Sequence, residues 1–194
     1  MLVSTMRLLI AINTILLRVG RNIAWVALAL MVFVILLQVF FRYILNNALN
    51  WPDEAARFLM LWMTGLIAPS AFRWGGFVAI DMLPLALPKK SGLILTLFLF
   101  SLSAIVLWVG LGLGWGHAMG FGGNFDSASL RLPFDLVGGE TVKVKLRYMY
   151  GSLLVGVFLL FLVNVELILR TIFSLFRPDI ELPTDAPATA METD

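Results

Sequence analysis

The chain has 194 residues, of which 60% are hydrophobic and only 13% are charged, and its mean hydropathy is +0.95. This is more apolar surface than a soluble domain of this length can bury, so part of the surface must face lipid. A formal net charge of +2 argues against a nucleic-acid-binding protein, and the absence of cysteine excludes disulfides, iron–sulfur clusters and thiolate zinc sites.

The first 22 residues predict an amphipathic helix at the membrane interface. Six polar side chains fall within an arc of about 100° on a helical wheel, and the larger apolar side chains lie outside it; the six are Ser4, Arg7, Thr14, Arg18, Arg21 and Asn22. Arg7, Arg18 and Arg21 interrupt the apolar residues, so a cleavable signal peptide is not expected. An equally good interpretation is that this segment extends the next helix into the cytoplasm.

Four long apolar segments predict four transmembrane helices, and hence an all-α integral membrane protein. A helix rises about 1.5 Å per residue, so about 20 apolar residues cross a hydrocarbon core about 30 Å thick. The second segment starts at Pro52, which is followed by Asp53 and Glu54, and this order suits the first turn of a helix. The predicted spans are residues 23–43, 52–72, 91–116 and 148–172, within a membrane domain of residues 23–176.

Charged and aromatic residues concentrate where the chain turns from the first span into the second. Asp53 and Glu54 precede Arg57 by four and three residues, so either carboxylate can reach this arginine on one helix face. Charge at the end of a span is costly unless it is paired, so Arg42 is expected to take the remaining acid. We therefore predict a structural network rather than a proton or ion relay. Its members are Arg42, Trp51, Asp53, Glu54, Arg57 and Trp62.

The segment between the third and fourth spans predicts a small β-hairpin. Residues 134–137 are followed by Gly138-Gly139, which is a turn signal, and residues 141–145 then alternate between polar and apolar side chains. Under the orientation given below, Lys143, Lys145 and Arg147 would face the periplasm and could dock a soluble acidic partner. The alternative is a solvated loop that faces lipid headgroups.

The rest of the chain gives three weaker signals. Glu166 and Arg170 are four residues apart near the end of the fourth span and predict an ion pair. Glycines at positions 110, 112, 114 and 116 indicate either closely packed helices or a flexible helix end. Residues 177–194 are rich in proline, threonine and acidic residues, which predicts a disordered cytoplasmic tail.

The distribution of charge bears on orientation and on function. Lys and Arg are slightly more numerous on the side of the two termini, which places both termini in the cytoplasm. The single histidine, His117, argues against a haem protein, and no pattern of residues indicates catalysis or a metal site. We therefore expect no catalytic residue, no metal and no cofactor.

Residues 20–115 carry a recognisable order of side chains. Arg42 is followed by the pattern Trp51-x-x-Glu54-x-x-Arg57 and then by Trp62. In this order they resemble the small membrane subunit of tripartite ATP-independent periplasmic (TRAP) transporters, the DctQ-like family. The sequence departs from the family after the second span, where a histidine is often present and Phe77 stands here. It also departs over residues 124–147, where the segment is longer and a proline common at the start of the fourth span is missing.

The resemblance implies a non-catalytic subunit of a transporter in the bacterial inner membrane. Members of this family pair with a large membrane subunit that carries the substrate and sodium sites, and a periplasmic substrate-binding protein delivers the solute. We expect this chain to scaffold the large subunit, to help dock the binding protein and to contact membrane lipids during ion-coupled uptake of a small organic anion or similar solute. The alternative is a stand-alone small dimeric transporter or an accessory subunit of another membrane complex.

Overall fold

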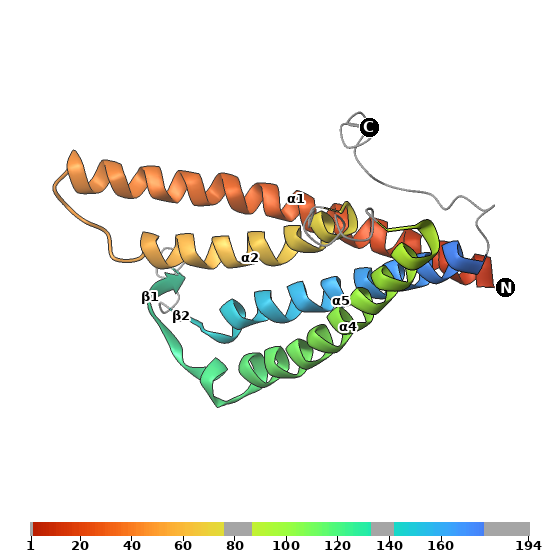
Figure 1. The fold of residues 1–194 in the computed structure, drawn as a ribbon. Coiled ribbons are helices and arrows are strands. Elements are labelled where there is room, and N and C mark those ends of the chain that lie inside the picture. Colours follow the sequence, from red (N-terminus) through yellow and green to blue (C-terminus); the bar gives the residue numbers. More distant parts are fainter. Residues whose placement is uncertain (1, 76–86, 133–141, 177–194) are drawn as a thin grey trace.

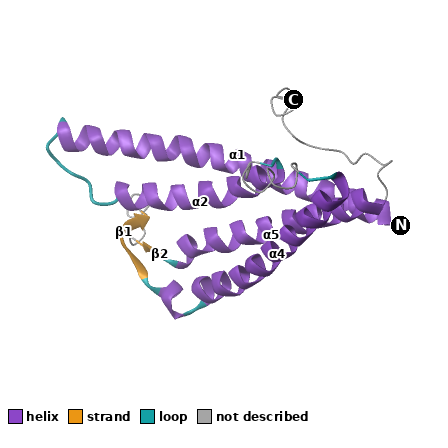
Figure 2. Ribbon diagram, viewed as in Figure 1, coloured by secondary structure: helices purple, strands orange, loops and turns teal. Residues whose placement is uncertain are grey.

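A computed structural model describes residues 2–75, 87–132 and 142–176 of the chain. Its four long helices are α1 (Leu2–Tyr43), α2 (Pro52–Arg73), α4 (Lys89–Met119) and α5 (Arg147–Phe176) (Figures 1 and 2). Between α4 and α5 lie the short 3-10 helix η1 (Phe121–Asn124) and the strands β1 (Asp126–Leu132) and β2 (Val142–Lys145). Within the described ranges, four helices are long and apolar enough to cross a membrane. The predicted all-α membrane fold with four transmembrane helices and a small hairpin is confirmed. The predicted tail lies outside the described residues.

Helix α1 continues through the N-terminal segment and the first predicted span without a break. Its 42 residues make it about 63 Å long at about 1.5 Å per residue, twice the thickness of a hydrocarbon core of about 30 Å. The N-terminal segment is therefore an extension of the first span, and its place at the membrane interface stays a prediction. Every third or fourth residue of this half is buried, namely Met6, Ile10, Asn13, Leu17, Gly20 and Ala24.

Helix α2 begins and ends where its local sequence dictates. Pro52 occupies the first turn, where its missing N–H needs no partner, and the acidic residues Asp53 and Glu54 follow it. At the other end the helix stops before Gly75, whose φ of 72° is in the left-handed region that favours glycine.

The four helices lie in a row in the order α1, α2, α5, α4 (Figure 1). Extensive contacts join each helix to its neighbour in the row, and α1 also touches α5. A small apolar core of Ala24, Leu66 and Leu159 lies where α1, α2 and α5 meet. Because the row is one helix thick over most of its length, large apolar side chains such as Phe33 and Trp108 remain more than 60% exposed.

Glycines allow the closest helix contacts in the row. A Cβ atom added at Gly65 of α2 would lie 2.7 Å from the backbone oxygen of Ser152 in α5, and one added at Gly156 would lie 2.9 Å from the Cα atom of Gly65. On α4, the glycines at 110 and 114 face α5 at ordinary or slightly close contact distance, whereas those at 112 and 116 have no neighbour within 4 Å. One of the two glycine faces of α4 thus serves helix packing.

The hairpin between α4 and α5 is a two-stranded antiparallel sheet of β1 and β2. Strand β2 falls on the predicted residues 142–145, but the described first strand begins earlier than predicted, at Asp126. Residues 134–137 and the Gly138-Gly139 turn lie outside the described ranges. The register is irregular between Asp126, which is paired with Lys145, and Arg131, which is paired with Lys143. This irregularity releases backbone N–H groups of β1 from the ladder.

Candidate functional site

Polar side chains gather at the two opposite ends of the helical row. The Glu54 site, at the end that carries the sheet, consists of Glu54 and the backbone of residues 128–130. The Glu166 site, at the end that carries the N-terminus, consists of Asn13, Thr14, Arg73, Glu166 and Arg170. Between these ends, residues 22–41, 58–72, 91–116 and 151–165 contain no Asp, Glu, Lys, Arg or His. The chain therefore keeps its ionisable groups away from the middle of its spans.

In the Glu54 site one carboxylate holds the irregular part of β1. Its Oε2 accepts hydrogen bonds from the backbone N–H of Ser129 at 2.6 Å, from the hydroxyl of Ser129 at 2.6 Å and from the N–H of Leu130 at 3.0 Å. Its Oε1 accepts one from the N–H of Ala128 at 3.1 Å. The bulge frees these three successive N–H groups, and bonds from them to an ionised carboxylate are stronger than neutral ones. Glu54 therefore anchors the sheet to the start of α2.

The predicted arginine–carboxylate network is not formed among Arg42, Asp53, Glu54 and Arg57. Glu54 is turned toward β1, and no ion pair within 4.0 Å joins any of these four residues in the described chain. Arg42 lies at the end of α1, which extends past the start of α2 (Figure 1), and its guanidinium sits 5.8 Å from the centre of the Tyr43 ring. The backbone N–H groups of β1 bind the Glu54 carboxylate in place of the arginines. The sequence gives no sign that β1 lies near Glu54.

The two tryptophans of the predicted cluster differ in their contacts. Trp62 donates a hydrogen bond from Nε1 to the backbone oxygen of Tyr148 at 3.1 Å, and its ring packs against Phe58. Trp51 precedes the first turn of α2 and is 38% exposed. Trp62 thus joins α2 to the start of α5, close to the sheet.

The three basic residues proposed for docking differ in their exposure and contacts. Lys143 and Lys145 of β2 are exposed. Arg147, at the start of α5, is half-buried and donates a close hydrogen bond from Nη2 to Oδ1 of Asn124. Arg147 therefore holds η1 against α5, and the two lysines form the open basic surface of the sheet.

The Glu166 site centres on a carboxylate that has no solvent exposure. Its Oε1 lies 2.9 Å from Nη2 of Arg73 and 2.8 Å from Nη2 of Arg170, while its Oε2 accepts a hydrogen bond of 2.7 Å from Asn13. Arg73 also donates a hydrogen bond of 2.9 Å to the hydroxyl of Thr14. A buried carboxylate is tolerated only when it is paired and hydrogen-bonded in this way. The site joins α1, α2 and α5 in one polar contact.

The sequence predicts the contact of this site that is local along the chain but not the contacts between distant segments. The spacing of Glu166 and Arg170 predicts their ion pair, and the structure brings them together. Arg73 and Asn13 were missed because they lie 93 and 153 residues from Glu166 along the chain. The available signal was Asn13 itself, a polar residue on the apolar face of the N-terminal helix.

Both sites use their charged groups in contacts within the chain. In the described part of the chain, no group of three or more His, Cys, Asp or Glu side chains is placed to hold a metal ion. The carboxylates of Glu54 and Glu166 are occupied by donors from their own chain. Both sites join elements that are distant in sequence.

Comparison with known proteins identifies the family. A family model described as the DctQ component of tripartite ATP-independent periplasmic transporters matches residues 31–174, which is most of the chain. Separate comparisons with curated proteins and with solved structures found no match. The matched residues include α2, α4, the sheet and nearly all of α5, together with residues 31–43 of α1. The chain is a member of the DctQ family, the small membrane component of TRAP transporters.

Proposed function

We propose that this chain is a non-catalytic scaffold that holds the large membrane subunit of its transporter and helps to dock a periplasmic substrate-binding protein. The proposal extends to sodium-coupled uptake of a small organic anion or similar solute, with both termini in the cytoplasm of the bacterial cell. The substrate and sodium sites would then lie on the large subunit.

The placement of charge is the observation that carries this proposal. Transporters that bind ions or polar solutes on their own chain place ionisable or broken helical segments near the middle of the bilayer. Here the middle of every described span lacks ionisable residues, and the buried charges at Glu166 are paired within the chain. A row of helices with two exposed apolar faces also offers a broad surface to a membrane partner.

The docking part of the proposal rests on Lys143 and Lys145. Both side chains are exposed on a sheet that Glu54 anchors to α2, so the sheet is held in a fixed position at the end of the spans. Opposite charges on two surfaces accelerate their encounter, and this effect weakens as salt screens it. The expected partner surface is an acidic patch of the binding protein.

Reversal of the charge on both lysines tests the docking role. We expect Lys143→Glu with Lys145→Glu to lower the initial rate of solute uptake when the binding protein is limiting, and to leave assembly with the large subunit unchanged. The matched control is Lys90→Glu, because Lys90 is also exposed but lies at the start of α4, at the other end of the row. Uptake that is unaffected by the double variant at limiting binding protein contradicts the docking role.

A further inference from the structure

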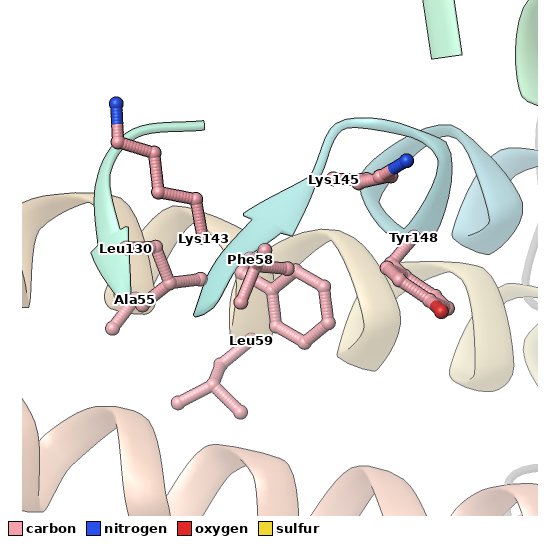
Figure 3. A pocket seen from close by; sticks show the side chains of 8 residues that line it. Ala55, Phe58, Leu59, Leu130, Lys143, Lys145 and Tyr148 are labelled. Carbon is pink, nitrogen blue, oxygen red and sulfur yellow. The ribbon is translucent and has the colours of Figure 1, made fainter. Parts of the chain in front are cut away.

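A pocket lies between the start of α2 and the small sheet, at the end of the row that carries the Glu54 site (Figure 3). Its volume is about 560 Å³, which is within the range of about 300–1,000 Å³ found for small-molecule sites. Helix α2 contributes Ala55, Phe58 and Leu59, and the sheet contributes Leu130. The docking role proposed above uses none of these four residues.

The lining of the pocket is amphipathic. Figure 3 shows the side chains of Phe58, Leu59 and Leu130 gathered beside strand β2, whereas the ammonium groups of Lys143 and Lys145 point away from this apolar group. Tyr148 closes one side with its ring. A ligand that fits this arrangement has an apolar chain and a polar head.

The charged residues at the rim of the pocket determine which charge the polar head of the ligand should carry. No carboxylate of the described residues lies within 4.0 Å of either ammonium group, although Asp126 is the backbone partner of Lys145 in the sheet. Glu54, the acidic residue of the neighbouring site, is already bonded by the N–H groups of β1. Two ammonium groups without a carboxylate partner among the described residues favour an anion, and a phosphate is the common anion at the surface of a membrane.

The position of the pocket identifies the source of the anion. Ala55 and Phe58 lie within the first two turns of the candidate span Pro52–Arg73, and Tyr148 lies at the start of the candidate span Arg147–Phe176. The ends of spans coincide with the boundary between the hydrocarbon core and the headgroups. Phospholipids therefore surround this pocket at the depth where an acyl chain meets its phosphate.

We propose that the pocket is a binding site for one anionic phospholipid, with an acyl chain against α2 and the phosphate beside Lys143 and Lys145. The bound lipid fills the apolar space beneath the sheet and neutralises the rim. The site shares both lysines with the docking role, so a bound phosphate and an acidic patch of the binding protein would compete for them. The apolar wall of the pocket belongs to the lipid site alone, so changes in this wall test the lipid site separately.

Photolabelling of the full-length protein in nanodiscs tests the site. The probes are phosphatidylglycerol and phosphatidylcholine, each with a diazirine on the acyl chain, and labelled peptides are identified by mass spectrometry. We expect phosphatidylglycerol to label the peptides that contain residues 55–59 and Tyr148 more strongly than phosphatidylcholine does. Replacement of both lysines by glutamine should lower this preference by about fivefold for each lysine removed, since each basic residue near the surface contributes attraction of that size.

Two matched variants separate a pocket from general lipid contact. Ala55→Trp fills the pocket and should abolish the labelling by phosphatidylglycerol, whereas Ala29→Trp adds the same group on the exposed side of α1 and should leave it unchanged. Labelling that survives Ala55→Trp in a folded variant overturns the site. Equal labelling by the two lipids, or a preference that persists without the lysines, also overturns it. Loss of labelling once the large membrane subunit is assembled assigns the pocket to that subunit and contradicts a lipid occupant.

Discussion

Two glutamates show how the same residue type stabilises the two ends of this protein. Glu54 satisfies backbone N–H groups that a strand bulge has released, and Glu166 is buried between two arginines and an asparagine. Removal of one partner from a buried ion pair is costly because it leaves the other charge unpaired. Each glutamate therefore links segments that are distant in sequence.

Replacement of Glu54 by alanine is expected to release the sheet from α2. Loss of these charge-assisted hydrogen bonds should lower the local stability of β1 by about 1–3 kcal/mol. Hydrogen–deuterium exchange measured by mass spectrometry should show faster exchange at the amides of residues 128–130.

The matched control for this variant is Asp53→Ala. Asp53 is the neighbouring acid, it is exposed, and it makes no ion pair within 4.0 Å in the described chain. Exchange at β1 should remain unchanged in this variant. Equal exchange in the Glu54 variant and the native protein contradicts the anchoring role of Glu54.

At the scale of elements, the long helices were predictable and most of their polar contacts were not. The bounds of α2 follow from Pro52 and the acidic residues beside it, and apolar length alone located α4 and α5. These signals act within a few residues of one another. Strand β1 gave no such signal, because it starts with the small polar run Asp126-Ser127-Ala128-Ser129 and depends on Glu54, which is about 75 residues away.

The same distinction explains the candidate sites. Apart from the expected pairing of Arg42 with an acid at the start of the second span, the predicted pairs of acids and bases lie three or four residues apart, where helix geometry makes contact possible. The structure forms the pair of Glu166 and Arg170 in this way, but it gives Glu54 to the backbone of β1. A short spacing shows that two side chains can meet, and distant donors decide whether they do.

The close contact of Gly65 and Gly156 predicts that a larger side chain at either position will weaken the packing of α2 against α5. In Gly156→Leu the new side chain would collide with the backbone of Gly65, which cannot move without separating the two helices. We expect a loss of stability of about 1–3 kcal/mol, measured as a lower midpoint of thermal unfolding in detergent.

Gly112→Leu is the matched control for this contact. Gly112 also lies inside a helix, but a Cβ atom there meets no atom within 4 Å. Because leucine favours a helix more than glycine does, this variant should unfold at or slightly above the midpoint of the native protein. An equal loss of stability in both variants contradicts close packing at Gly65 and Gly156.

At the scale of the whole molecule, the row of helices is the feature that most affects function. A closed four-helix bundle hides one stripe of each helix, whereas this row leaves side chains on both faces exposed along α1 and α4. Exposed apolar surface of this extent must be covered by lipid or by another membrane protein. A small TRAP subunit of this shape can offer one face to a large partner and the other to the bilayer.

The most direct test of the scaffold role is to isolate the chain from native membranes in mild detergent, at its normal expression level, and to identify by mass spectrometry what remains bound. We expect the large membrane subunit of the same transporter to be recovered in a fixed ratio to this chain. We also expect liposomes containing this chain alone to show no solute uptake. Recovery of the chain by itself or only as a homodimer, together with uptake by the chain alone, would contradict the scaffold role.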